Sequence, residues 1–289
     1  MSQVHEWLVL GAGGMLGTDL VSLLRARGVN VTAATRADVD VTDADAVAAA
    51  VGAASVVVNC SAYTAVDAAE TNVEAAERIN AVAPGVIAAA CAAVGARLVH
   101  ISTDYVFAGD AVAPYGEDAP VDPASVYGAT KARGEQSVRD SGADALIVRT
   151  AWLYGANGPS FPSTIARLAL ERDQIAVVDD QRGQPTWTCD LAEFIVRLID
   201  ADAPPGTYHG TASGQCTWFD FAERVVQSQG SSASVQRTTT EAFPRPAHRP
   251  AWSVLGHERH EALGVPSIGQ WDQRWDVAAP HVISALGAR

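Results

Sequence analysis

Trp7-Leu8-Val9-Leu10-Gly11-Ala12-Gly13-Gly14-Met15-Leu16-Gly17 is the part of this 289-residue chain that indicates its fold most clearly. Its first four residues are apolar, which predicts a short buried strand, and glycines follow at once. Gly11, Gly14 and Gly17 form the pattern G-x-x-G-x-x-G, which lets the backbone turn tightly and approach a pyrophosphate at the start of the next helix. The stretch therefore predicts the first strand, turn and helix of a dinucleotide-binding fold. Its candidate cofactor contacts are Gly11, Gly14, Met15, Leu16 and Gly17.

Short apolar runs alternate with helical patterns through the first half of the chain. Further strands are predicted over residues 28–32, 55–59, 97–102 and 145–149, and helices over residues 16–27, 43–51 and 73–94. This alternation is typical of an α/β fold with a doubly wound, Rossmann-like parallel sheet, in which ligands bind beyond the carboxyl ends of the strands.

Prolines interrupt this pattern after Thr150, where helices are predicted over residues 190–199 and 218–229. We therefore expect a dinucleotide-binding domain over residues 1–150. A smaller C-terminal lobe over residues 151–289 would bind the substrate, with residues of about 175–200 returning to the first domain.

Composition and charge restrict the class of protein further. Apolar residues make up 48% of the chain and its formal net charge is −13 at pH 7, which indicates a globular protein without a general attraction for nucleic acid or anionic membranes. The four cysteines are widely separated and have no metal-binding spacing, so reduced thiols are expected. The first residues lack the basic start and apolar run of a signal peptide. These features predict a cytoplasmic protein.

Lys131 is the only lysine of the chain, and it lies four residues after Tyr127. On a helix, residues at this spacing share a face. A neighbouring cation favours the phenolate and is expected to lower the pKa of Tyr127, which would make the phenol a useful proton donor near neutral pH. A solvated helical pair is the alternative. The hydroxyl of Thr103 and the carboxyl of Asp104 end the predicted fourth strand, so both are expected near the helix of Tyr127.

Residues at the ends of the second and third strands are further candidate contacts of the dinucleotide. Arg36 follows the second strand and suits a 2′-phosphate, which favours NADPH, although NADH could also be accepted. A surface arginine with no ligand is the alternative for Arg36. Asp40 and Val41 lie where adenine would be held. The residues expected where the cofactor crosses the sheet edge are Ser61, Ala62 and Tyr63.

The glycine loop, the stretch Ser102–Phe107 and the pair of Tyr127 and Lys131 together resemble the extended short-chain dehydrogenase/reductase superfamily. Within it, the chain is similar almost from end to end to the dTDP-4-dehydrorhamnose reductase family. Further matching motifs are Tyr63-Thr64-Ala65-Val66-Asp67-x-Ala69-Glu70, Arg149-Thr150-Ala151-Trp152-Leu153-Tyr154, Asp180-Gln181-x-Gly183-x-Pro185-Thr186, Tyr208-His209-x-x-Ala212-Ser213-Gly214 and Arg245-Pro246-x-x-x-Arg249-Pro250.

The resemblance implies a role for each matching residue. It makes Tyr127 the acid, Lys131 its activator and ribose anchor, and Thr103 the second hydroxyl on the carbonyl oxygen of the substrate. Trp152 would form a wall against the sugar, or else pack between the lobes. Arg249 would meet the nucleotide diphosphate, or else form a structural salt bridge. The remaining candidate substrate contacts are Thr64, Val66 and Asp104.

The resemblance also bears on metal and oligomeric state. Some reductases of this family use acidic residues and Mg2+ at a dimer contact. Asp19 occupies a plausible position for such a ligand, but the rest of the acidic set is not evident. Both a monomer and a homodimer stay open, and so does Mg2+.

The reaction that the resemblance implies is reduction by NADPH of the C4 carbonyl of a nucleotide-linked 6-deoxy-4-keto-hexose, with dTDP-4-dehydro-L-rhamnose as the expected substrate. A related deoxysugar 4-ketoreductase and an epimerase with a retained NAD stay open. A non-catalytic protein resembling the regulatory subunit of methionine adenosyltransferase also stays open. Dehydratases of the superfamily carry Glu after the Thr-Asp pair, and Tyr105 at that position argues against dehydration.

Overall fold

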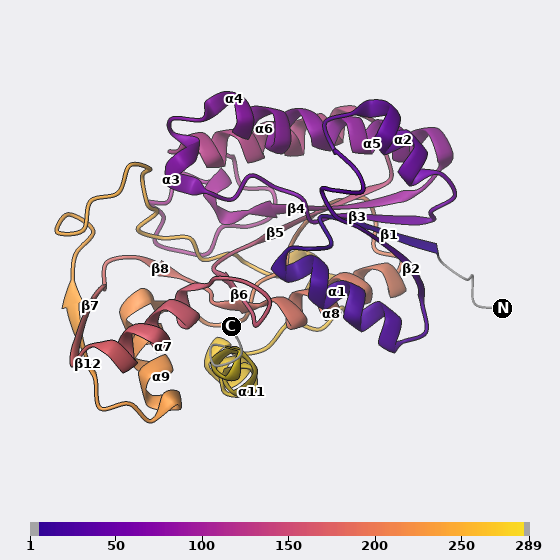
Figure 1. The fold of residues 1–289 in the computed structure, drawn as a ribbon. Coiled ribbons are helices and arrows are strands. Elements are labelled where there is room, and N and C mark those ends of the chain that lie inside the picture. The colour runs from indigo at the N-terminus through magenta and orange to yellow at the C-terminus, as the bar shows by residue number, and fades with distance from the viewer. Residues whose placement is uncertain (1–5, 286–289) are drawn as a thin grey trace.

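The computed structural model describes residues 6–285, and a six-stranded parallel sheet lies at its centre (Figure 1). The strand order is β10-β5-β4-β3-β1-β2. These strands are β1 (Glu6–Leu10), β2 (Asn30–Ala34), β3 (Val56–Asn59), β4 (Arg97–Thr103), β5 (Ala145–Thr150) and β10 (Gly206–His209). All neighbours pair in parallel, so their carboxyl ends meet at one edge. The order reverses between β1 and β3, directly beside the glycine loop, and the predicted α/β class is confirmed.

Helices cover both faces of the sheet (Figure 1). One face carries α1 (Met15–Ala26) and α8 (Thr188–Asp200), and the other carries α2 (Ala44–Val51), α5 (Ala83–Val94) and α6 (Val126–Asp140). The apolar side chains of α1 and α8 form one core with β1, β3 and β5. All four residues of β3 are buried, as expected for a strand covered on both faces.

The helical segment Val73–Val94 is continuous but not uniform. It consists of α4 (Val73–Glu77), a π-helical turn η1 (Arg78–Val82) and α5. By length and composition it could span a membrane, with a hydropathy of 1.3 over its most apolar window. In this structure its inner side chains Ile87, Ala88 and Cys91 are fully buried with those of the sheet, so the segment is packed as a core helix.

Part of the chain after Thr150 packs around a separate aromatic core that includes Tyr154, Phe221 and Trp275, here called the smaller lobe. Its helices are α7 (Phe161–Glu171), α9 (Trp218–Gln229) and α11 (Trp271–Ser284), whereas α10 (Glu258–Ala262) packs against the edge strand β10 of the central sheet. Its short strands pair as β6 (Leu153–Tyr154) with β9 (Thr186–Trp187), β7 (Gln174–Val178) with β12 (Ser234–Thr238), and β8 (Arg182–Gly183) with β11 (Cys216–Thr217). Two further short elements, α3 (Val66–Ala69) and η2 (Asp104–Val106), lie in loops of the first half.

The structure differs from the predicted elements in two places. The second strand begins at Asn30, not Gly28, because Gly28 has a φ of +71° and the N–H of Val29 still bonds the carbonyl of Leu24 at the end of α1. The second difference is the edge strand β10, which lies after the segment of about 175–200 that was expected to return to the first domain and pairs with β5; α8, within that segment, packs against α1. The four residues of β10 are too few and too mixed to predict a strand. The division of the chain at residue 150 stays a prediction.

Candidate functional site

The glycine loop turns directly over the end of β3. Gly11 has a φ of +75°, and a Cβ added to it would lie 2.7 Å from the backbone nitrogen of Ser61. A Cβ on Gly17 would lie 2.4 Å from the carbonyl oxygen of Gly11. Helix α1 then begins at Met15 with no side chain capping its first turn. The free N–H groups of that turn suit an anionic group, so the loop fits the pyrophosphate of a dinucleotide.

The loop after β2 brings Arg36 and Asp40 to the same edge of the sheet. The N–H of Ala12 in the glycine loop bonds the carbonyl of Ala34 at the end of β2 at 3.1 Å. Arg36 is exposed. Hydrogen bonds from the backbone and the hydroxyl of Thr42 lower the pKa of Asp40, which is therefore already engaged within its own loop. Val41 packs against the core between the sheet and α5.

The loop after β3 is held by two asparagines. Asn59 accepts hydrogen bonds from the backbone and hydroxyl of Ser61 at 3.0 and 2.5 Å. Asn80, in the π-helical turn, bonds both the N–H and the carbonyl of Tyr63, and donates to Thr130 of α6 at 3.2 Å. Sequence reasoning missed Asn80, although a buried amide in an apolar helix was a usable signal. Ala62 lies half-buried between these anchored positions.

Helix α6 places Tyr127 close to Thr103. Ser125 caps the helix by accepting a hydrogen bond from the N–H of Gly128 at 3.1 Å. A Cβ on Gly128 would lie 2.1 Å from the carbonyl oxygen of Tyr105, so the helix rests on the backbone just after β4. The ring of Tyr127 meets that of Tyr105 edge to face, with 5.5 Å between centroids. The structure therefore brings the predicted phenol and hydroxyl together.

The expected lowering of the Tyr127 pKa is wrong in this structure. Burial raises the pKa of Tyr127 to about 12, opposed by a hydrogen bond with Thr103 and reinforced by the charge of Asp104. Lys131 does not offset this burial because its ammonium donates instead to the carbonyl oxygen of Ile101 in β4, at 2.6 Å. The phenol is consequently protonated at neutral pH and keeps its proton until a stronger base is near.

Lys131 is itself 2% exposed. Burial lowers the pKa of Lys131 to about 8, while the carboxylate of Glu135 and the thiol of Cys60 act in the opposite direction. Lys131 is thus not a solvated helix residue. The protonation state of its ammonium depends on burial and on the neighbouring groups Glu135 and Cys60.

Glu135 is a second residue that sequence reasoning missed. It is fully buried, one helical turn after Lys131, and accepts hydrogen bonds from Ser102 at 2.6 Å and from both Nε and Nη2 of Arg149 at 2.8 and 2.7 Å. A further bond comes from Arg139 at 2.7 Å. Although burial alone would raise it, these donors lower the pKa of the Glu135 carboxyl. The only feature of the sequence that pointed to Glu135 was its spacing of four residues from Lys131.

Asp104 lies beside the hydroxyl of Thr103, which donates to it at 2.8 Å. The side chain is 2% exposed, and burial raises the pKa of Asp104 to about 6, partly opposed by the neighbouring hydroxyls of Ser253 and Thr103. Its carboxyl therefore takes up a proton at a higher pH than an ordinary aspartate, in the turn directly after β4.

A cleft of about 670 Å3 lies between the two lobes. Thr64, Val66 and Asp67 line one side of it, and the other side includes Phe161 and two arginines. Arg249 donates to Asp67 at 2.8 Å, so the salt bridge that was the alternative for Arg249 is present.

Arg245 pairs with the same carboxylate at 2.6 Å. Burial would raise the pKa of Asp67, but hydrogen bonds and the charges of Arg245 and Arg249 lower it overall. The carboxylate is therefore ionised and holds both guanidinium groups at the cleft.

Trp152 stands where the chain passes from the sheet into the smaller lobe. Its φ of +47° is rare for a residue with a side chain. The indole stacks on that of Trp218, with 3.4 Å between centroids and 5° between planes, and a Cβ on Gly183 would lie 2.3 Å from it. Trp152 is half-buried, so packing against the lobe is established and a sugar-facing surface stays a prediction.

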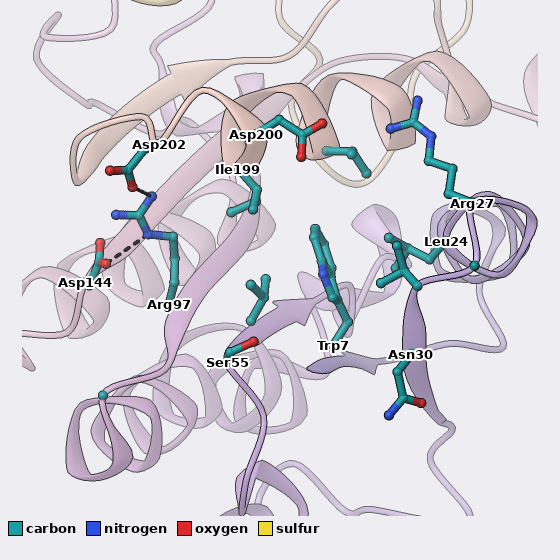
Figure 2. Close-up of a pocket in the computed structure, with 15 residues that line it drawn as sticks. Trp7, Leu24, Arg27, Asn30, Ser55, Arg97, Asp144, Ile199, Asp200 and Asp202 are labelled. Carbon is teal, nitrogen blue, oxygen red and sulfur yellow. Dashed lines mark hydrogen bonds and ion pairs between the residues drawn. The ribbon is translucent and has the colours of Figure 1, made fainter. Parts of the chain in front are cut away.

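A larger cavity, of about 870 Å3, lies at the opposite edge of the sheet (Figure 2). Asn30 and Arg97, which begin β2 and β4, line it together with Trp7. Arg97 pairs there with Asp144 at 2.8 Å and with Asp202 at 2.9 Å. Ligands of open α/β sheets bind at the carboxyl ends of strands, so this cavity is separate from the candidate site.

Asp19, the candidate Mg2+ ligand, has both carboxylate oxygens engaged within the described chain, and Mg2+ at a dimer contact stays open. Its two carboxylate oxygens accept hydrogen bonds from Asn157 at 2.7 Å and from Thr188 at 2.5 Å. Within residues 6–285, no group of three or more His, Cys, Asp or Glu side chains is placed to hold a metal ion.

A glycine loop at the switch point of a parallel sheet, with a half-buried tyrosine and a buried lysine on the neighbouring helix, defines a dinucleotide-dependent oxidoreductase of the short-chain dehydrogenase/reductase type. Residues 5–282 match the family described as RmlD substrate binding domain. A dTDP-4-dehydrorhamnose reductase from Streptomyces griseus is 47% identical, covering 98% of this chain and 95% of that protein. The chain belongs to the dTDP-4-dehydrorhamnose reductase family.

Two other relatives bear on the site. A dTDP-4-keto-6-deoxy-D-glucose reductase from Streptomyces niveus is 43% identical, covering 95% of this chain and 96% of that protein. The crystal structure of a dTDP-4-dehydrorhamnose reductase from Bacillus anthracis in complex with NADP has a TM-score of 0.92 at 36% identity, covering 95% of this chain and 98% of that one. An NADP(H) site in this protein agrees with the geometry of the glycine loop.

Trp152→Ala is expected to lower the free energy of unfolding by about 3 kcal/mol because the stack with Trp218 is lost. Trp218→Ala, the matched control, removes the same stack from the other side. If the indole of Trp152 also faces the sugar, Trp152→Ala loses at least about tenfold more kcat/KM than the control, with unchanged NADPH affinity. Thermal melting, NADPH titration and steady-state kinetics measure these effects. Equal losses of kcat/KM in both variants would assign Trp152 to packing alone.

Proposed function

We propose that this protein uses NADPH to reduce the C4 keto group of a nucleotide-linked 6-deoxy-4-keto-hexose, with dTDP-4-dehydro-L-rhamnose as substrate and dTDP-L-rhamnose as product. The observation that carries the proposal is the seating of α6 on the carbonyl of Tyr105, which sets Tyr127 beside Thr103 at the edge where the glycine loop opens. The names of the relatives and the NADP-bound neighbour support the substrate and the cofactor. The unpaired cysteines support a cytoplasmic location. Both a monomer and a homodimer are compatible with the proposal.

Tyr127, Thr103 and Lys131 have different roles in the reduction of the carbonyl group. Bound NADPH supplies the hydride. Reduction turns the carbonyl oxygen into an alkoxide, which is a stronger base than a phenolate, so Tyr127 can give up its proton despite a pKa of about 12. When the substrate binds, the hydroxyl of Thr103 turns from Asp104 and donates its hydrogen bond to the same oxygen. The ammonium of Lys131, one turn along α6, stabilises the phenolate that remains.

The direct test is NADPH oxidation in the presence of a dTDP-linked 4-keto-6-deoxy-hexose, followed by determination of the configuration at C4 of the product. The relative from Streptomyces niveus favours one second candidate, a ketoreductase acting on a different 4-keto-6-deoxy-hexose, which the product configuration would reveal. Tightly bound NAD in the purified protein would point to an epimerase, and binding without turnover to a regulatory protein.

Tyr127→Phe is expected to lower kcat by about 10²–10⁴-fold, because the ring and its packing remain while the proton donor is lost. NADPH affinity should change little. Single-turnover kinetics and NADPH titration check both statements. Retention of more than about a third of kcat with chemistry rate-limiting would show that another group donates the proton.

The kcat/KM of the protein is expected to fall as the pH rises through about 8, because burial has lowered the pKa of Lys131 and its ammonium is lost in that range. Lys131→Arg keeps a charge that does not titrate there, but the planar guanidinium does not fit the site of the ammonium. The variant should therefore be much slower and lack the alkaline decline. A pH profile of kcat/KM measures both, and an identical alkaline limb in the variant would assign it to another group.

Arg36→Ala is expected to reduce the preference for NADPH over NADH by about tenfold or less, because Arg36 is exposed and salt screens its contact with a 2′-phosphate. The ratio of kcat/KM for the two cofactors, measured in low and high salt, gives the size of the effect. An unchanged ratio would mean that another residue reads the 2′-phosphate.

A further inference from the structure

The segment Gly155–Gly158, between β6 and α7, lies directly against the start of α1. A Cβ on Gly158 would lie 2.5 Å from Cγ of Met15 and 3.2 Å from its sulfur. A Cβ on Gly155 would lie 2.2 Å from the hydroxyl oxygen of Thr188 and 3.5 Å from a carboxylate oxygen of Asp19. A side chain at Gly155 would clash with Thr188 of α8, and one at Gly158 would displace the side chain of Met15, so both glycines allow a close approach.

One carboxylate fastens this segment to two helices. Asp19 lies four residues after Met15 on α1 and accepts a hydrogen bond from the side chain of Asn157, within the segment, at 2.7 Å. Its other oxygen accepts a bond of 2.5 Å from the hydroxyl of Thr188, the fully buried first residue of α8. Asp19 thus joins the segment, the cofactor helix and α8 at a single point.

We propose that Asp19 is a positioning residue that holds Gly155–Gly158 as a cover over the bound dinucleotide. The inference rests on the proposed use of NADPH, whose pyrophosphate would lie at the start of α1, beside Met15. A cover that is fastened by a charge-assisted hydrogen bond and lies over the bound dinucleotide must open before the cofactor leaves, so loss of the bond is expected to speed dissociation. The chain continues into Pro159 and Phe161, which line the cleft for the sugar nucleotide, so the same segment borders both ligands.

The experiment measures NADPH binding to the full protein by titration, and NADPH dissociation by stopped flow. The variants are Asp19→Ala, Asn157→Ala and the double variant. Each single change is expected to raise the Kd for NADPH about tenfold, chiefly through faster dissociation, because each removes the same charged hydrogen bond. The double variant should be no weaker than Asp19→Ala, since two residues that share one bond are not additive.

Glu193→Ala is the matched control. Glu193 of α8 pairs with Arg27 just past the other end of α1, so this change also removes a bond between the α1 region and α8 without touching the segment. It should leave the Kd for NADPH within about twofold of wild type. Melting temperatures and dTDP binding show which variants are folded.

The outcomes separate the two proposals. Failure of the wild-type protein to bind NADPH would overturn both. Normal NADPH binding by the wild type with a Kd unchanged in Asp19→Ala and Asn157→Ala would overturn only the cover. Additive effects of the two changes, or an equal effect of Glu193→Ala, would also overturn it, because they would trace the loss to helix packing.

Discussion

The buried carboxylate of Glu135 is the interaction on which the geometry of the site depends. It accepts hydrogen bonds from Ser102 of β4 and Arg149 of β5, and so joins α6 to the carboxyl ends of these two strands, next to Thr103. A buried charge is costly unless it is paired and its oxygens are hydrogen-bonded, and the two-bond contact with Arg149 meets that condition. Loss of one partner would leave the other charged in the core. The pairing therefore fixes the angle of the helix that carries Tyr127 and Lys131.

The single lysine follows from the same arrangement. Lys131 has to fit between α6 and β4, where its ammonium reaches the carbonyl of Ile101. A guanidinium is larger and planar, so a chain that otherwise uses arginine keeps one lysine at this point. The nearby carboxylate of Glu135 opposes the effect of burial on its charge, and so one buried acid both positions the helix and supports its cation.

Much of the fold could be predicted because the signals are local. Continuous apolar runs and the glycines at 11, 14 and 17 mark β1, β3, β4 and α1, and a spacing of four places Tyr127 and Lys131 on one helix. Contacts between distant residues could not be predicted in this way. The periodicity of the sequence does not predict that Ser102 and Arg149 bond to Glu135, or that Asn80 bonds to the backbone of Tyr63. The sign of the Tyr127 pKa shift was wrong for the same reason: spacing predicts which side chains share a face, but burial and the partner that the ammonium selects decide the charge.

The cleft resolves an apparent conflict between a strongly acidic protein and an anionic substrate. At a net charge of −13 the overall field repels a nucleotide diphosphate, so attraction has to be local. Arg245 and Arg249 face one carboxylate, Asp67, which leaves an excess of positive charge at the cleft. Asp67 also fixes both side chains before a ligand arrives, which lowers the entropy lost when they meet a phosphate. A salt bridge and a diphosphate contact are therefore compatible roles for Arg249, because the carboxylate engages only part of its guanidinium and the remaining donors can face the cleft.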